Sequence, residues 1–438
     1  MANTYNYLKS AWLKISNLTN HHSVFICLLA AILIAIPLKY IFGSITSILF
    51  VAVAFSYIST TKISFSKFLI LPIAFFIIML LSLIWTSDFK LTSSALQKEL
   101  SFLFIPLAFL FMPKLTKEDF RKVFRIFSFA MVIFALYYFA NAVIRFLETG
   151  NKSVFFYHEL VTMDLNAIYV SVFASFSLFY FITTECKLLI EKIALVILII
   201  LVFLLSSKSI ITIDFLLVIC YYSFFAKIPN GVKSTTIIAV SSFLLFSILF
   251  VKEVKQRFLL EYQTAFVDNT INSSIGNADA KVYNVSLKQA WHNSNFQPNH
   301  FFPGTALRVY QIRIFKEMLD EQNIFFTGFG LNATQEKIKE KAGQHHLYLG
   351  YGEFNFHNQY IQTFAELGFF GFLILVGMLY FNLKNGWVQK DFLHIVFAIT
   401  MIILFLSESF FCRQRGVIFF ITIYCMLNGQ NVLKKANT

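Results

Sequence analysis

A row of polar side chains opens the stretch NFHNQYIQTFAELGFFGFLI, residues 355–374, which ends in apolar residues. His357 is the first candidate for chemistry, because imidazole titrates near pH 6.5 and can take a proton from a hydroxyl group at neutral pH. Asn358, Gln359 and Tyr360 follow it directly and are candidates for binding the substrate. The alternative is an interfacial polar cap, because His and Tyr are common at the depth of lipid head groups.

Two arginines precede this row on a helix predicted over residues 305–321. Arg308 and Arg313 are five residues apart, which places them about 140° apart around a helix axis, so they need not share a target. Arg308 follows a Pro-Gly turn, and a guanidinium group can hold a phosphate with two parallel hydrogen bonds. Arg313 fits a solvated face equally well. We therefore expect Arg308 to act in catalysis, and Arg313 is a secondary candidate for binding the substrate.

Further charged residues lie at or near the ends of apolar segments, where charges are costly and usually face a cavity or a partner. They are Lys98, Glu99, Lys208, Asp214, Glu408, Arg413 and Arg415. Glu408 could simply pair with Arg413, and Lys208 could pair with Asp214. The four cations, Lys98, Lys208, Arg413 and Arg415, map to the outer side of the membrane in the topology below. Such a basic rim suits an anionic lipid head group or a diphosphate.

The composition places these residues in a membrane protein. The chain has 438 residues, of which 58% are hydrophobic and 13% charged, whereas soluble domains carry about 25% charged residues. A transmembrane helix needs about 20 mostly apolar residues, and the sequence predicts an all-α polytopic protein with about 12 transmembrane helices. The candidate segments are residues 24–38, 41–58, 68–85, 100–112, 123–146, 165–182, 193–205, 210–225, 236–251, 368–381, 392–406 and 417–427.

The distribution of Lys and Arg predicts the orientation. With the N-terminus inside, the cytoplasmic segments carry roughly twice as many Lys and Arg as the short outer loops, as the positive-inside rule requires. The net charge of +13 therefore reflects topology, and we expect no nucleic acid partner. Both termini are expected in the cytoplasm. The expected organisation is a bundle of about nine spans (1–251), an extracytoplasmic loop with short helices (252–356) and about three further spans (357–438).

The loop has few features of its own that point to chemistry. Residues 305–321 and 333–341 are predicted helices, and TGFGLN at 327–332 is a predicted turn. The histidines at 300, 345 and 346 are interpreted as surface residues, because no carboxylate lies at ligand spacing. The five cysteines lack metal-ligand spacing, and no phosphate-binding loop is present. We therefore expect neither a metal nor a cofactor.

Taken together, these residues resemble the membrane O-antigen ligase and O-antigen polymerase superfamily. Its signature is a large external loop before a late helix that begins His-Asn-x-Tyr, here His357 to Tyr360, and continues to Glu-x-Gly-x-x-Gly, here Glu366 to Gly371. The family's Arg-led helix ending in a Gly-x-Gly turn is matched by Arg308 and by residues 328–330. The usual Trp and Pro of that stretch are absent. Lys208 stands where the family often has Arg, which keeps the charge but loses the guanidinium fork.

The resemblance implies a multi-spanning, GT-C-like glycosyltransferase in a bacterial inner membrane, using no metal. The donor would be a glycan on undecaprenyl diphosphate, and the acceptor a hydroxyl group on lipid A–core. His357 would be the base and Arg308 would bind the diphosphate. The other residues of the proposed substrate site would be Lys98, Lys208, Arg313, Asn358, Gln359, Tyr360, Glu366, Glu408 and Arg413. The alternatives are a polysaccharide polymerase, a protein oligosaccharyltransferase and, without chemistry, a flippase or other transporter of lipid-linked glycans.

Overall fold

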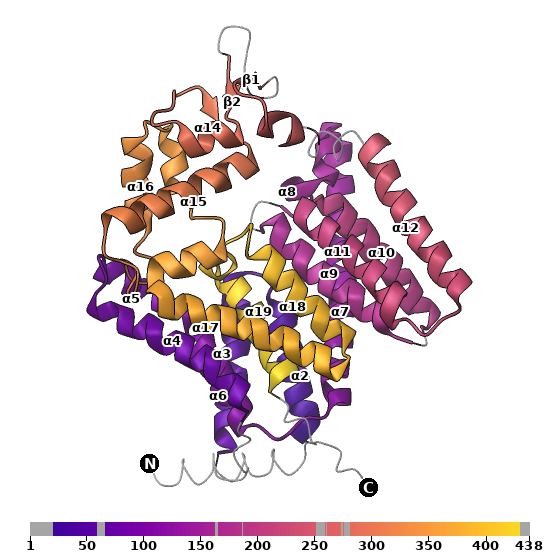
Figure 1. The fold of residues 1–438 in the computed structure, drawn as a ribbon. Helices are drawn as coiled ribbons and strands as arrows, with labels where there is room; N and C mark the ends of the chain where they lie inside the picture. Colours follow the sequence, from indigo (N-terminus) through magenta and orange to yellow (C-terminus); the bar gives the residue numbers. More distant parts are fainter. Residues whose placement is uncertain are drawn as a thin grey trace.

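The computed structural model describes residues 21–58, 66–162, 165–185, 187–250, 261–272 and 281–429, together with Leu259 and Ile275. This part of the chain is mostly helical, as the sequence predicts (Figure 1). The two chain ends, for which a cytoplasmic location is expected, lie outside the described residues.

Each apolar segment identified in the sequence coincides with a helix. The corresponding helices are α2 (His21–Ala35), α3 (Tyr40–Ser56), α4 (Ile70–Leu81), α6 (Ser101–Phe111), α7 (Lys117–Thr149), α9 (Ala167–Thr183), α10 (Leu189–Leu205), α11 (Lys208–Cys220), α12 (Asn230–Phe250), α17 (Gln359–Gln389), α18 (Phe392–Leu404) and α19 (Gln414–Asn428). By length and composition, five helical stretches of the described part could cross a membrane: Lys67–Ile84, Phe89–Phe111, Lys117–Thr149, Lys208–Phe225 and Gln359–Gln389.

One of the boundary differences from the sequence prediction concerns Lys98. The segment expected at residues 100–112 is preceded by helix α5 (Phe89–Glu99), and the two together form one of the five long stretches. Asp88 starts α5, because its side chain accepts a hydrogen bond from the Leu91 amide at 2.9 Å. Lys98 therefore lies inside a helical stretch rather than in front of one.

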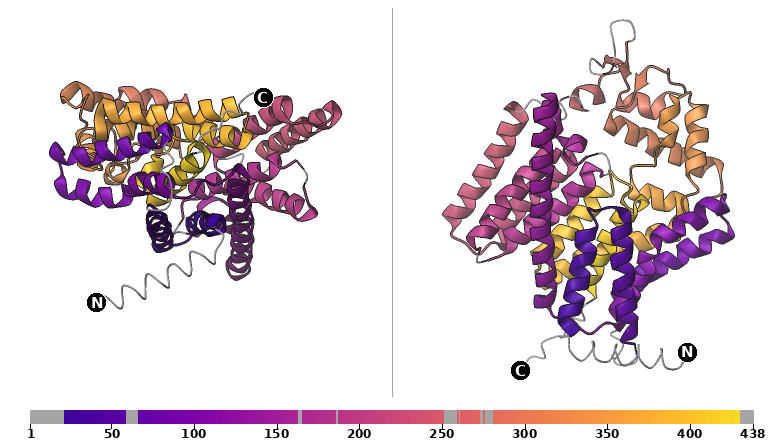
Figure 2. Two further views of the ribbon diagram at one scale, coloured as in Figure 1. Left: turned by 90° about the horizontal axis from the view of Figure 1, so that it is seen from below. Right: turned by 180° about the vertical axis from the view of Figure 1, so that it is seen from behind.

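The described residues between α12 and α17 build a separate small unit at one end of the molecule (Figures 1 and 2). Its helices are α14 (Leu287–His292), α15 (Gly304–Glu321) and α16 (Gln335–Gln344), and its strands are β1 (Thr270–Ile271), β2 (Tyr283–Asn284) and β3 (His300–Phe301). Strand β2 pairs antiparallel with β1 and parallel with β3. The unit has a hydrophobic core of its own, centred on side chains such as Tyr310, Ile314 and Phe356.

This unit is fastened to the bundle at a kink in α17. Gly368 has φ +66° and ψ −166°, so α17 consists of two helical parts that meet there. The Phe369 amide donates to the Phe325 carbonyl at 2.8 Å, and the Phe329 amide donates to the Ala365 carbonyl at 2.8 Å. The predicted turn at 327–332 is thus confirmed, and it lies against the kink.

The same turn contacts the first half of the bundle. The Trp85 indole donates to the Thr327 carbonyl at 2.8 Å, and the Ser87 amide donates to the Phe329 carbonyl at 2.9 Å. Gly330 has φ +103°, and a side chain there would overlap Thr86. Residues 327–330 therefore join α17 to the segment that connects α4 and α5.

Candidate functional site

The polar row at residues 357–360 attaches the start of α17 to the connection between α18 and α19. Asn358 is the N-cap of α17, and its side-chain oxygen accepts a hydrogen bond from the Ile361 main-chain amide. The main-chain amide of Asn358 donates to Ser409 Oγ at 3.1 Å. The Gln359 side chain accepts from the Phe411 amide at 2.7 Å. Tyr360 donates through its hydroxyl to the Ile402 carbonyl at 2.9 Å.

These bonds leave one member of the row, His357, to face outward. His357 lies one residue before the N-cap rather than in the first helical turn, and its φ of +45° is in the left-handed region. Its amide donates to the side-chain oxygen of Asn355 at 2.9 Å. This turn directs the imidazole away from the helix axis and leaves the side chain 29% exposed.

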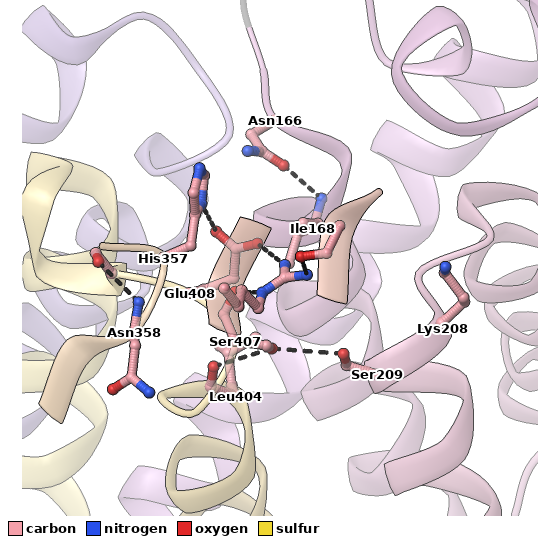
Figure 3. Close-up of polar contacts among 12 residues, drawn as sticks. Asn166, Ile168, Lys208, Ser209, His357, Asn358, Leu404, Ser407 and Glu408 are labelled. Atoms are coloured by element: carbon pink, nitrogen blue, oxygen red, sulfur yellow. Dashed lines mark hydrogen bonds and ion pairs between the residues drawn. The ribbon is translucent and has the colours of Figure 1, made fainter. Parts of the chain in front are cut away.

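Glu408 lies beside His357 at the other side of this junction (Figure 3). His357 Nδ1 is 3.8 Å from Glu408 Oε2, and the carboxylate is largely buried. The second carboxylate oxygen, Oε1, is 3.4 Å from Arg308 Nη2. Glu408 therefore pairs with Arg308 and His357, and not with Arg413 as one reading of the sequence allowed.

Arg308 reaches this junction from the loop unit, on the first turns of α15. Its Nε donates to the Ser407 carbonyl at 3.0 Å, and its Nη1 donates to the Gly304 carbonyl at 3.1 Å. Arg308 is partly exposed, with 29% of its side chain accessible. The guanidinium group is thus held in place by carbonyl groups while one side of it remains open.

A second cation, Lys208, lies close to the same helix start. Lys208 Nζ is 2.5 Å from Glu261 Oε2, and the other carboxylate oxygen of Glu261 accepts from the Thr305 amide at 2.5 Å. A Cβ atom at Gly304 would lie 3.2 Å from Arg308 Nη1 and 3.8 Å from Glu261 Oε1. The carboxylate of Glu261 therefore sits among Lys208, the N-terminus of α15 and Arg308.

The hydrogen bonds of Glu261 also affect its titration. Burial alone would raise the pKa of this carboxyl group, but the hydrogen bonds from Lys208 and Thr305 outweigh burial and hold the pKa below its ordinary value.

On the bundle side, Ser209 of α11 approaches Ser407, with 3.4 Å between the two hydroxyl oxygens (Figure 3). The N-terminus of α11 and the connection after α18 thus form two walls of one cluster, which we call the His357 cluster: His357, Glu408, Arg308, Lys208 and Glu261.

Arg313 belongs to a different set of contacts inside the loop unit. Its Nε donates to Glu317 at 2.8 Å, and its Nη1 donates to the Asn293 carbonyl at 2.6 Å. His345, interpreted above as a surface residue, is mostly buried next to it, with Nε2 3.4 Å from Glu317 and Nδ1 3.0 Å from the Tyr310 hydroxyl. The 140° between the two arginines thus separates them: Arg308 reaches the cluster and Arg313 does not.

The remaining candidates from the sequence lie apart from these contacts. Glu366 is buried, accepts from Gln362 at 2.7 Å and has its carbonyl bonded to the Gly330 amide at 2.9 Å. Lys98 lines a small cavity of about 30 Å³ that it shares with Glu366. Arg413 is exposed at the start of α19. Among the described residues, Asp214 accepts from Ser175 while Lys208 pairs with Glu261, so the pairing of Asp214 with Lys208 is wrong.

Sequence reasoning missed Glu261 entirely. It stands at the edge of the long loop, and nothing in its neighbours distinguishes it from other loop carboxylates. The only available signal was indirect, because a cation at the end of an apolar segment usually has a partner.

Within the described residues, no group of three or more His, Cys, Asp or Glu side chains could hold a metal ion.

One comparison with known proteins matches the part of the chain that contains most of the His357 cluster. A search of curated proteins finds no match. A family model described as O-antigen ligase matches residues 193–376, which include α10 to α12, the loop unit, His357 and the kink of α17. Residues 193–376 are therefore similar to the O-antigen ligase family, in agreement with the resemblance drawn from the sequence.

Proposed function

We propose that the protein is an O-antigen ligase-type glycosyltransferase. It would move a glycan from undecaprenyl diphosphate to a hydroxyl group of lipid A–core, at the periplasmic face of a bacterial inner membrane. In this proposal the chain crosses the membrane about twelve times in a GT-C-like arrangement, with both termini in the cytoplasm. The family match supports the general class, and the His357 cluster supports the reaction.

His357 acts as the general base. Its Nδ1 faces the Glu408 carboxylate, which favours the tautomer with a proton on Nδ1 and leaves Nε2 free to accept one. Nε2 takes the proton of the acceptor hydroxyl as the oxygen attacks the anomeric carbon. The new carbon–oxygen bond forms while the bond between the anomeric carbon and the diphosphate oxygen breaks. Attack from the opposite side inverts the anomeric centre.

Arg308 and Lys208 bind the diphosphate of the donor. Negative charge grows on the diphosphate as it leaves, and fixed cations placed there stabilise the transition state. Undecaprenyl diphosphate is a good leaving group, so the reaction needs no general acid. Both cations are within reach of the N-terminus of α15, where main-chain amides add to the attraction for an anion.

Glu261 occupies this anion site in the absence of a donor. A carboxylate held by Lys208 and the Thr305 amide takes the place of one phosphate group. Binding of the donor then requires Glu261 to move away from Lys208. The single observation that carries the proposed function is therefore the junction of His357, Glu408 and Arg308, with a second cation, Lys208, beside it.

The test is glycan transfer in a strain that lacks its own ligase, complemented with wild type or His357→Ala at matched expression. His292→Ala is the matched control, because His292 is an exposed histidine of the loop unit. We expect long chains on lipid A–core with wild type and the control, and glycan left on the carrier lipid with His357→Ala. Activity of His357→Ala equal to wild type would contradict the proposed base and favour a transporter.

The same assay in a strain that lacks its own polymerase separates a ligase from a polymerase. Without a polymerase, this strain places single repeats on the acceptor. A polymerase would restore long chains there, and a ligase would not. A protein oligosaccharyltransferase would place the glycan on a protein band. Both outcomes would retain the chemistry of His357 but change the acceptor.

A further inference from the structure

A large basic cavity lies at the end of the bundle remote from the His357 cluster. Helix α17 begins next to His357 and ends at Gln389, which lines the cavity. At about 1.5 Å per residue, the part of α17 after the kink at Gly368 is about 30 Å long, close to the thickness of a bilayer's hydrocarbon core. Helix α18 returns from the cavity towards Glu408. In the topology predicted from the sequence, the cavity and the cluster lie at opposite membrane surfaces.

The cavity has a volume of about 950 Å³ and is lined by five segments of the chain. These are the start of α7, the end of α9, the segment after α11, the turn between α17 and α18, and the end of α19. Three of its lining side chains are acidic. Seven are basic: Lys117, Arg121, Lys122, Arg125, Lys187, Lys227 and Lys390.

Two of these cations pair with buried carboxylates: Arg125 is 3.2 Å from Glu191, and Lys122 is 3.4 Å from Asp119. Arg121 is 3.9 Å from an exposed Glu118. Lys227 and Lys390 are exposed and form no ion pair with any other described residue. The lining therefore retains an excess of positive charge that is open to a ligand.

The helix ends at the cavity do not supply the anion site themselves. Asp391 caps α18 and accepts from the His394 amide, whereas Asp119 and Glu191 accept from the amides of the N-cap residues of α7 and α10, Thr116 and Leu188. At each of these helix starts, one main-chain amide already has a carboxylate partner. An anion in the cavity would therefore be bound by side-chain cations.

Aromatic residues line the cavity beside the cations. Phe392 packs against Phe225, with 4.8 Å between ring centroids, and against Tyr221 at 5.0 Å. Trp387 does not line the cavity itself, but it lies next to Phe225 at the cavity's edge and is 64% exposed, as is usual for Trp at the level of lipid head groups. A ligand with both an anionic group and an apolar part would match such a lining.

We propose that this basic cavity binds the phosphate head group of an anionic phospholipid, with the acyl chains against the surface formed by Phe225 and Trp387. Basic pockets between transmembrane helices at the cytoplasmic surface bind such head groups. The excess of Lys and Arg at this end also agrees with a cytoplasmic location. Bound lipid would support the turn between α17 and α18, the two helices whose other ends hold His357 and Glu408.

The test uses the full-length protein in detergent, with lipid binding measured by native mass spectrometry and by the shift of the thermal midpoint. The ligands are cardiolipin, phosphatidylglycerol, phosphatidylethanolamine and glycerol 3-phosphate. The variant is Lys227→Gln with Lys390→Gln. The matched control is Lys90→Gln with Lys152→Gln, which removes two exposed lysines that do not line the cavity.

We expect the two anionic lipids to bind wild type and the control and to raise their thermal midpoints, while phosphatidylethanolamine does not. The cavity variant should bind anionic lipid more weakly, by about fivefold for each lysine removed. Equal binding by the variant and the control would overturn the proposal. Glycerol 3-phosphate binding as tightly as the lipids would also overturn it, and would assign the cavity to a soluble phosphate compound.

If the cavity variant folds poorly, its midpoint without lipid will be below that of the control. Arg121→Gln then provides the second measurement, because Arg121 is exposed and its ion pair is long. A loss of lipid affinity in this variant, at an unchanged midpoint without lipid, supports the proposal. Unchanged affinity for both anionic lipids contradicts it.

Discussion

His357 Nδ1 lies 3.8 Å from Glu408 Oε2. His357 precedes α17 and Glu408 follows α18, so both residues lie at the ends of these two helices that are away from the turn between them. The distance is too long for a hydrogen bond but suits a pair that tightens when the substrate binds. Glu408 also faces Arg308 with its other oxygen. The Glu408 carboxylate therefore orients the proposed base, His357, and compensates the positive charge of Arg308, which is proposed to bind the diphosphate.

Glu408→Gln should lower kcat by about 100-fold, within the range of acid–base contributions. Glutamine keeps the shape of the side chain but cannot stabilise the imidazolium ion that forms when His357 takes the proton. The KM for the lipid-linked donor should not increase, because Arg308 loses a competing anion. Glu408→Asp should recover part of kcat. Steady-state kinetics with a purified donor measure both constants.

The control for this variant is Glu340→Gln, which removes an exposed carboxylate paired with Lys337. It should retain full kcat. If Glu408→Gln lowers kcat only in proportion to a loss of folded protein, Glu408 has a structural role and the assignment fails.

Glu261→Gln should decrease the KM for the donor about fivefold, roughly 1 kcal/mol of binding free energy. The carboxylate competes with phosphate for Lys208 and the Thr305 amide, and glutamine competes less. In a Lys208→Gln background the effect of Glu261→Gln should shrink, because the two residues act on one site. Kinetics of the two single variants and the double variant measure the coupling.

Glu353→Gln is the control for the Glu261 variant, since Glu353 pairs with an exposed lysine of the loop unit. A higher KM for Glu261→Gln, together with a lower thermal midpoint, would mean that Glu261 fastens the loop unit and does not occupy the anion site.

Features that depend on neighbouring residues could be predicted from the sequence. Apolar segments gave the helices of the bundle, because length and composition decide whether a segment needs lipid. The periodicity of residues 305–321 predicted α15, and Gly328 and Gly330 predicted the turn, where both adopt positive φ. The order of residue types also predicted His357 and Arg308 as site residues, and the structure brings the two together at Glu408.

The partners of these residues could not be predicted, because they come from segments far apart in the chain. Glu408 is joined to Arg308, and Glu261 to Lys208, only by the packing of the loop unit on the bundle. The same is true of Asn358, whose main-chain and side-chain amides donate hydrogen bonds to the connection after α18. A polar row alone does not distinguish a residue that binds substrate from one that fastens two helices.

The loop unit should lose stability in mild acid through His345. Burial lowers the pKa of His345, although Glu317 opposes this effect and Arg313 adds to it. Because the folded-state pKa is depressed, the contribution of His345 to stability is present above the unfolded pKa of about 6.5 and is lost as the pH falls below it. Hydrogen exchange of amides in α16 at pH 7.5 and pH 5.5, corrected for intrinsic rates, measures this loss.

His345→Gln provides the comparison, because glutamine does not titrate in this range. The variant should show a smaller difference between the two pH values than wild type. Burial also lowers the pKa of His300, but His300 is present in both proteins and cancels in the comparison. An identical pH difference in both proteins would exclude His345 as the cause.

Gly368→Ala should prevent normal assembly of the junction between the loop unit and the bundle. Gly368 has φ +66°, and a side chain there would overlap the Phe326 carbonyl. Strained backbone of this kind costs about 1–3 kcal/mol before any overlap, so the thermal midpoint and glycan transfer should both fall. Gly377→Ala makes the same chemical change in the same helix, at a position with no heavy atom within 4 Å. It should be neutral or stabilising, because Ala exceeds Gly in helix propensity by about 1 kcal/mol. Equal midpoints for the two variants in detergent would show that the kink at Gly368 is not needed to hold the turn at residues 327–330.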